Sequence, residues 1–207
     1  MQLQTIIYMD RRAGSNRPPA RIAGSAPRAE RRWSAGQIQI SWPGRYDRAM
    51  IEQGAKAPDF ELPDQDGRPV KLADFRGQPV VVYFYPKAST PGCTAQACGV
   101  RDHGPDYKQA GAIVLGISPD PVAKIKKFAD EYDLDFPLLA DEDHAVAECY
   151  DVWVEKSMYG RKYMGNERTT FILDSEGMIV EVLRKVKPAE HDEKALAALA
   201  DAGPPVF

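Results

Sequence analysis

Two cysteines five residues apart are the residues of this 207-residue chain that most clearly suggest chemistry. Cys93 follows a strongly apolar run, residues 79–85 (PVVVYFY), and stands where helical sequence begins. Thr90 is placed to be the N-cap and Pro91 suits the first helical position, so Cys93 falls at the third. Free N–H groups and the positive end of the helix dipole there stabilise a thiolate. Such surroundings lower the pKa of a thiol from about 8.5 to roughly 3.5–7.5, so Cys93 is a candidate nucleophile.

Position alone leaves two interpretations of Cys93 open, a reactive thiolate or a small apolar residue buried at a helix start. In a continuous helix, Cys98 is turned by about 140° from Cys93 and its Cα is roughly 8–9 Å away, beyond the ~7 Å limit for a disulfide. The two can bond only if the first turns unwind, which Gly92 and Gly99 would ease; otherwise Cys98 simply packs in the helix. Cys149 stands among apolar residues and is predicted to belong to the core.

Other cysteine chemistry fits the sequence poorly. Three cysteines in 207 residues do not make a disulfide scaffold. The four-residue gap between Cys93 and Cys98 is longer than the gap usual in zinc sites, and His103 and His144 have no partner at ligand spacing. We therefore predict no metal site.

The elements that must position Cys93 follow an α/β pattern. Residues 79–85 and 112–118 are continuous apolar runs typical of strands buried on both faces, and helical sequence over 91–109 joins them as a βαβ unit. The remaining predicted elements are a hairpin over 59–72, a helix over 121–132, a short strand at 136–139, a short helix at 144–150, a hairpin of strands 169–173 and 178–186, and a closing helix over 190–200. This pattern predicts one three-layer α/β domain with a mixed sheet.

Charge divides the chain into two pieces. The net charge is −3, but residues 1–50 hold nine Arg, no Lys and three acids, a balance of +6, so the other 157 residues carry −9. The overall acidity argues against a generic nucleic-acid binder. A run of about 18 apolar residues, which a membrane-spanning helix needs, is absent from the sequence.

The basic piece, residues 1–49, is too poor in apolar residues to form a core, and we expect it to be a disordered extension. It resembles an organelle import peptide in its Arg content, it could be an interaction arm, or the working protein could start at Met50. We favour the last explanation, which leaves a domain of residues 50–207 and a cytoplasmic location. Arg11 and Arg12 interrupt the first apolar residues, so a secretory signal is not predicted.

Two segments of the acidic piece resemble a known family. Residues 86–98 (PKASTPGCTAQAC) are similar to the active-site segment of peroxiredoxins, with the pattern P-x-x-x-T-x-x-C met at Pro86, Thr90 and Cys93. Residues 167–174 (ERTTFILD) look like the strand that carries the active-site arginine of that family. The likeness is greatest to the bacterioferritin comigratory protein, or peroxiredoxin Q, subfamily, and it covers residues 51–203.

The resemblance implies a thioredoxin-like fold with peroxiredoxin additions, a central mixed β-sheet flanked by helices. It also implies roles for five residues. Cys93 matches the peroxidatic cysteine, Cys98 the resolving cysteine, and Thr90 the hydroxyl that contacts thiolate and peroxide. Arg168 matches the guanidinium beside the sulfur, and Pro86 matches the residue that shields the pocket.

The function implied is a thiol-dependent peroxidase for hydrogen peroxide and organic hydroperoxides. Cys93 would become a sulfenic acid, Cys98 would resolve it as an intrachain disulfide, and thioredoxin or a similar dithiol would reduce that bond. The resemblance implies no metal or organic cofactor, and an in-chain resolving pair permits a monomer. A thioredoxin-like disulfide oxidoreductase is the alternative, but it would require a Cys-x-x-Cys spacing.

Overall fold

Strand β3 (Val80–Phe84) forms the centre of the fold, as its continuous apolar run predicts. The computed structural model describes residues 51–158 and 160–202, and in it β3 is the middle strand of a five-stranded sheet of order β5-β4-β3-β8-β9. Strand β4 (Ile113–Ser118) runs parallel to β3, and β8 (Thr169–Leu173) runs antiparallel to it. All five residues of β3 are buried, because both faces of the sheet are covered. The predicted mixed sheet is confirmed.

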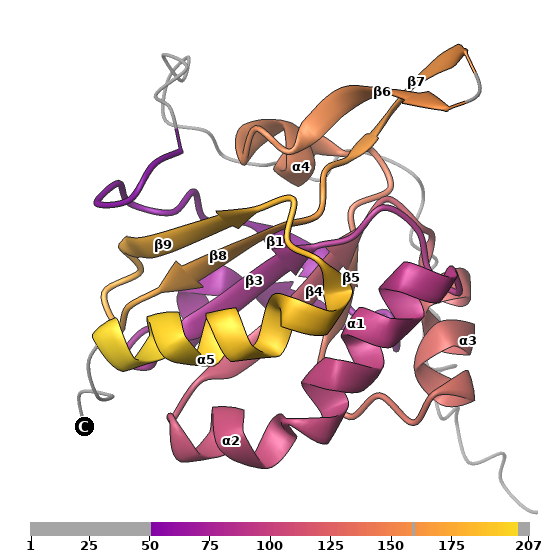
Figure 1. Cartoon of the computed structure of the whole chain (residues 1–207). Helices are drawn as coiled ribbons and strands as arrows, with labels where there is room; N and C mark the ends of the chain where they lie inside the picture. Colours follow the sequence, from indigo (N-terminus) through magenta and orange to yellow (C-terminus); the bar gives the residue numbers. More distant parts are fainter. Residues whose placement is uncertain (1–50, 159, 203–207) are drawn as a thin grey trace, which may run out of the picture. The chain divides into compact units, whose positions relative to one another are not determined.

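One face of the sheet is covered by the long helices. Alternate residues of a strand point to opposite faces, and Val81 and Tyr83 share a core with α1 (Pro91–Asp102), α3 (Val122–Glu131) and α5 (His191–Asp201). Figure 1 shows α1 and α5 in front of the sheet and α3 at its right, beside α1. The predicted helices over 121–132 and 190–200 are confirmed to within two residues at each end.

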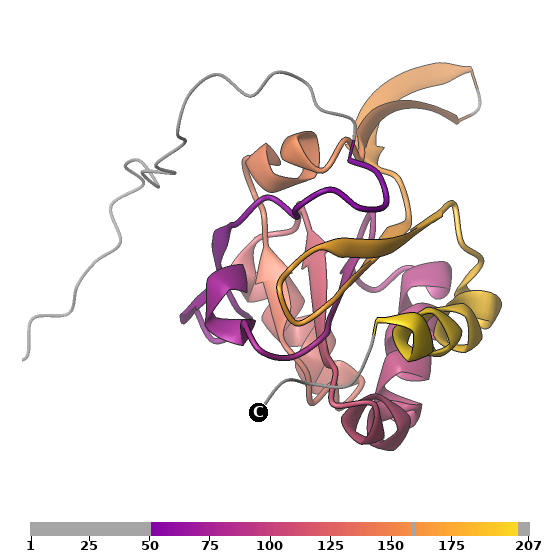
Figure 2. The same cartoon turned by 90° about the vertical axis from the view of Figure 1, so that its left-hand side faces the viewer.

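The other face carries a thinner layer. Val82 packs in a second core with the antiparallel hairpin of β1 (Glu61–Pro63) and β2 (Pro69–Lys71), the short helix η1 (Leu72–Phe75) and α4 (Ala145–Cys149). Figure 2 shows this layer on the side of the sheet away from α1 and α5. The predicted hairpin over 59–72 and the three-layer arrangement are therefore confirmed.

Two edge strands and a short connecting helix complete the main sheet and its covering. Strand β5 (Leu138–Ala140) pairs parallel with β4, and β9 (Ile179–Arg184) pairs antiparallel with β8, as the second predicted hairpin requires. The helix η2 (Pro188–Glu190) then leads from β9 into α5.

The single helix predicted over residues 91–109 is in fact two helices. Helix α1 ends at Asp102, and α2 (Gly104–Gln109) begins two residues later. Pro105 lies in the first turn of α2, where its missing N–H does no harm. In the interior of a continuous helix, its ring would clash with the preceding turn, so the chain breaks at His103.

A third hairpin was not predicted. Strands β6 (Trp153–Met158) and β7 (Arg161–Asn166) pair antiparallel as a separate two-stranded sheet, which projects beyond the layers in Figure 1. Tyr163 and Met164 are 44% and 49% exposed. Because neither face of the hairpin packs fully on a core, the sequence lacks the apolar alternation by which a half-buried strand is found.

The Arg-rich extension, residues 1–49, lies outside the described residues. Over residues 51–158 and 160–202, no helix has the length and apolar character needed to cross a membrane. The same residues contain no cluster of three or more His, Cys, Asp or Glu side chains that could hold a metal ion.

Asp141 joins the end of β5 to the start of α4. Its carboxylate accepts hydrogen bonds from the N–H groups of Val146 and Ala147, at 3.2 and 2.8 Å, and the residue is fully buried. Burial raises the pKa of Asp141 from 3.8 to about 6, because it outweighs the two backbone hydrogen bonds that lower the pKa.

We expect Asp141→Asn to change how stability depends on pH. Since the folded-state pKa lies above the unfolded one, the protonated carboxyl stabilises the fold below about pH 4, and this contribution is lost as the pH rises through about 6. Between about pH 4 and pH 7, the free energy of unfolding of the variant should therefore rise by about 3 kcal/mol relative to that of the wild type, as measured by urea unfolding. Glu142→Gln, at the exposed carboxyl of the next residue, is the control. Stability curves of D141N and wild type that run parallel across this range would contradict the expectation.

Candidate active site

The loop between β3 and α1 brings Cys93 to the carboxyl end of the central strand. The helix starts as predicted, with Thr90 as N-cap and Pro91 at the first position, so Cys93 occupies the third. The first helical hydrogen bond runs from Thr94 N–H to the Thr90 carbonyl at 2.8 Å. The N–H groups of Gly92 and Cys93 therefore have no partner within the helix, and they lie at its positive end.

Arg168 lies beside the Cys93 sulfur. It stands immediately before β8, which pairs with β3, so the two antiparallel strands carry Arg168 to the end of the sheet where α1 starts. Its Nη2 donates a hydrogen bond to Cys93 Sγ at 3.2 Å. A Cβ atom on Gly92 would lie 3.4 Å from the same Nη2, so the glycine leaves room for the guanidinium over the helix start. Cys93 itself is only 2% exposed.

Gln96 is a site residue that the sequence analysis missed. It is fully buried, and its Oε1 accepts a hydrogen bond from Arg168 Nη1, so the guanidinium bridges Gln96 and Cys93. The Nε2 of Gln96 has no partner among the described residues. A signal was present in the sequence, since Gln96 is one turn after Cys93 and is the polar residue on the buried face that also holds Ala97 and Val100.

Thr90 keeps its predicted position but does not cap the helix with its side chain. Its hydroxyl donates to the Lys87 carbonyl at 3.0 Å. With its hydrogen committed to that bond, the Thr90 oxygen is left as an acceptor. Pro86 is half-buried and begins the same loop.

Cys98 lies on the same unbroken helix as Cys93, and both thiols are free. Cys98 is half-buried, whereas Cys93 is buried. The expectation that α1 separates the two sulfurs is thus confirmed, and a bond between them requires the first turns to open. Cys149 is half-buried at the margin of the second core rather than inside it.

Lys156 brings a second cation to the site from the unpredicted hairpin. This half-buried residue of β6 donates a hydrogen bond from Nζ to the Asn166 carbonyl. Burial lowers the pKa of Lys156, and the charge of Arg168 lowers it further, while Glu167 and Cys93 raise it. The Lys156 ammonium therefore interacts electrostatically with both Cys93 and Arg168. No pattern in the sequence relates residue 156 to residue 93.

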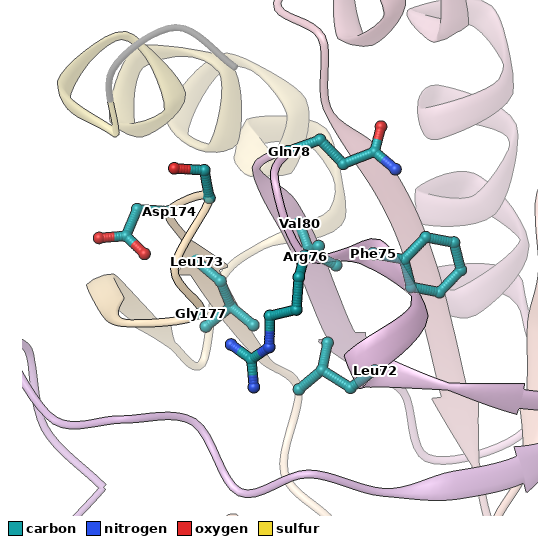
Figure 3. Close-up of a pocket in the computed structure, with 9 residues that line it drawn as sticks. Leu72, Phe75, Arg76, Gln78, Val80, Leu173, Asp174 and Gly177 are labelled. Carbon is teal, nitrogen blue, oxygen red and sulfur yellow. The ribbon is translucent and has the colours of Figure 1, made fainter. Parts of the chain in front are cut away.

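The small cavity in Figure 3 does not belong to this site. It lies at the opposite end of β3, around Val80 and Leu173, and its volume of about 10 Å³ holds one water molecule at most. Arg76 fills the neighbouring space, pairing with Asp59 at 2.9 Å and lying where Gly177 would carry a Cβ. Gly177 has φ +80°, so glycine suits this turn for both reasons.

Comparisons with known proteins agree with this geometry. Residues 53–182 match the AhpC/TSA family. The chain is 51% identical to "Peroxiredoxin Bcp" of Escherichia coli (strain K12) over 146 residues, 70% of this chain and 94% of the relative. It is 46% identical to "Peroxiredoxin Bcp" of Bacillus subtilis (strain 168) over 151 residues, 73% of this chain and 96% of the relative.

Solved structures give the same result. The bacterioferritin comigratory protein of Xanthomonas campestris, described in a study of its alkyl peroxide reduction activity, is 41% identical with a TM-score of 0.66. The match covers 70% of this chain and 92% of that one. Peroxidoxin BcpB of Mycobacterium tuberculosis is 39% identical with a TM-score of 0.66, covering 73% of this chain and 97% of that one.

Proposed function

Because the chain belongs to the AhpC/TSA family, as a peroxiredoxin of the Bcp and Q type, we propose that Cys93 is the thiol with which it reduces peroxides. The chain is a thiol-dependent peroxidase with a thioredoxin-like fold. The observation that carries the assignment of Cys93 is the 3.2 Å hydrogen bond from Arg168 to its sulfur. A permanently charged donor beside a thiol at a helix N-terminus favours the thiolate.

In the first step, the Cys93 thiolate attacks one oxygen of the peroxide. A sulfur–oxygen bond forms, the oxygen–oxygen bond breaks, and the departing oxygen leaves with the electron pair and takes a proton to become water or an alcohol. Cys93 is oxidised to sulfenic acid. Arg168 has a donor fork that serves both the sulfur and the oxygen on which charge develops. Thr90 accepts a hydrogen bond from the peroxide, and Pro86 shields the pocket.

In the second step, the Cys98 thiol condenses with the sulfenic acid. The sulfur–sulfur bond forms as the sulfur–oxygen bond breaks, and water leaves. Helix geometry keeps the two Cα atoms roughly 8–9 Å apart, so α1 must open before the sulfurs meet. Local opening of a few helical residues is accessible at a free energy below that of global unfolding.

In the third step, a thioredoxin-type dithiol reduces the disulfide by exchange and is itself oxidised. The substrate class extends to organic hydroperoxides, which is supported by the alkyl peroxide reduction named for the Xanthomonas relative. The disulfide oxidoreductase alternative is less supported, because Cys93 and Cys98 do not have the Cys-x-x-Cys spacing.

Residues 50–207 suffice for this activity in our proposal, since every assigned residue lies among them. We propose further that the enzyme works as a monomer in the cytoplasm. The in-chain pair of Cys93 and Cys98 needs no second subunit, and free cysteines are typical of a reducing compartment. Sedimentation of the reduced protein and localisation of the full chain with a C-terminal tag test these two statements.

The experiment that tests the function is coupled turnover. In the presence of thioredoxin and its reductase, the chain should oxidise NADPH only when hydrogen peroxide or an alkyl hydroperoxide is added. The rates should be equal for the full chain and for residues 50–207. Reduction of insulin disulfides without peroxide would instead support the oxidoreductase.

Cys98→Ser should stop the cycle after its first step. The variant should consume about one equivalent of peroxide per chain and then stall with thioredoxin, because the sulfenic acid has no resolving thiol. Mass spectrometry of the oxidised wild type should show a bond between residues 93 and 98, and Cys149→Ser should form the same bond. Unchanged thioredoxin-dependent turnover of C98S, or a bond that includes Cys149, would remove Cys98 from the mechanism.

A further inference from the structure

Asp120 is a buried carboxylate that none of the steps above uses. It is 7% exposed and lies just beyond the end of β4, beside the loop that leads to Cys93. Its Oδ2 accepts hydrogen bonds from the Ala88 backbone N–H at 2.6 Å and from the Ser118 hydroxyl at 3.4 Å. Its Oδ1 is paired with the ammonium of Lys124, which lies four residues later in the first turn of α3. Ser118 and Lys124 thus hold the carboxylate in place, and the carboxylate in turn binds one backbone N–H of the loop.

The loop that Asp120 holds contains a strained residue. Ser89 has φ +56°, in the left-handed region that is unfavourable for a non-glycine residue. Such a conformation persists only where neighbouring contacts impose it. Two contacts flank Ser89: the Ala88 N–H bond to Asp120, and the Thr90 hydroxyl bond to the Lys87 carbonyl. Of these two, the bond to Asp120 is the one that joins the loop to another segment of the fold.

We propose that Asp120 is a positioning residue for the peroxide reaction, holding the loop of residues 86–90 so that Pro86 and Thr90 face the peroxide bound at Cys93. The inference rests on the proposed function, because it assigns Asp120 to the first step of that reaction. A charged acceptor gives a stronger hydrogen bond than a neutral one, and Ala88 lies two residues from both Pro86 and Thr90.

Asp120 acts on the peroxide and not on the thiolate. The groups that favour ionised Cys93 are the free N–H groups of Gly92 and Cys93 in the first turn of α1, and Arg168, which comes from the strand end before β8. None of these groups lies in the loop of residues 86–90, which ends at Thr90, the N-cap of α1. Loss of the Asp120 hydrogen bond should therefore displace Pro86 and Thr90 while Cys93 remains a reactive thiolate. Two reagents distinguish these effects: hydrogen peroxide, which needs the loop, and iodoacetamide, which needs only the thiolate.

The test compares the two rates in Asp120→Ala on the full chain. The rate constant of Cys93 with hydrogen peroxide, measured by stopped flow, should fall about 10–100-fold, as misplaced reacting groups do. Alkylation of Cys93 by iodoacetamide should stay within about twofold of wild type. Asp120→Asn should react with peroxide within about threefold of wild type, because the amide oxygen still accepts from the Ala88 N–H. Should the alanine variant not fold, Asp120→Ser gives the same comparison, since its side chain is too short to reach Ala88.

Asp130→Ala is the matched control. Asp130 is an exposed carboxylate on α3 with the same type of ion pair one turn away, to Lys126 at 2.8 Å, and both rates should equal those of wild type. Equal losses in the two rates of D120A, no loss in either, or a D120N variant as slow as D120A would overturn the proposal. If wild-type Cys93 itself does not react with peroxide, the proposed function fails instead, so the two failures are distinguishable.

Discussion

Replacing Cys93 with serine should abolish peroxide-dependent turnover. The site is built to hold a thiolate: the sulfur is 2% exposed, lies at the start of α1 and accepts a hydrogen bond from Arg168 at 3.2 Å. A serine hydroxyl stays protonated at neutral pH and cannot take an oxygen atom from a peroxide to form the sulfenic acid. We expect the thioredoxin-coupled rate to fall by about a thousandfold or more, to the background without enzyme.

The fold should survive this change, because serine differs from cysteine by one atom and occupies similar space in the core. Thermal unfolding within about 1 kcal/mol of the wild type would separate loss of chemistry from loss of structure. Cys149→Ser is the matched control and should keep full turnover. Burial raises the pKa of the Cys149 thiol, and the charges of Asp141 and Glu148 raise it further, so it is the poorer nucleophile. Turnover retained by C93S would assign the reaction to another residue.

The parts of the fold that could be predicted from sequence are those in which a short run of neighbouring residues determines the burial or the local structure. The run of residues 79–85 identifies the central strand because every side chain in it is buried. The placement of Cys93 at a helix start follows from the sequence Thr90-Pro91, since the two residues have different and well-understood preferences at that position. These two local signals already supply the electrostatic reason for a reactive thiol.

The parts that could not be predicted depend on contacts between distant segments. Arg168 is 75 residues from Cys93 in the sequence, and only the resemblance to a family predicted that the two lie together. In the structure, the pairing of β3 with β8 brings them together. The charge of Lys156 acts on the site from a hairpin whose sequence carries no buried stripe. The carboxylate of Asp120 binds the backbone N–H of residue 88. Almost any residue type has this group, so the presence of Ala88 in the sequence does not predict the contact.

Replacing Arg168 with methionine should slow the reaction of Cys93 with hydrogen peroxide by roughly 10²–10³-fold, the usual cost of losing a donor aimed at developing charge. Methionine fills similar space but donates no hydrogen bond to the sulfur, to Gln96 or to the departing oxygen. Unlike Asp120→Ala, this variant should also react more slowly with iodoacetamide, because the guanidinium favours the thiolate itself. Thiolate absorbance at neutral pH should fall in parallel.

The size of the effect in Arg168→Lys separates charge from geometry. Lysine restores the positive charge but is a single point donor, so it cannot bridge Cys93 and Gln96 as the guanidinium fork does. We expect alkylation close to wild type and a peroxide rate about tenfold low, since the departing oxygen loses its oriented donor. Arg184→Met is the control: this arginine lies opposite Thr169 on β9 and pairs with Glu167 near the surface. Wild-type peroxide rates in R168M, or losses of equal size in R184M, would mean that the guanidinium beside the sulfur takes no part in breaking the oxygen–oxygen bond.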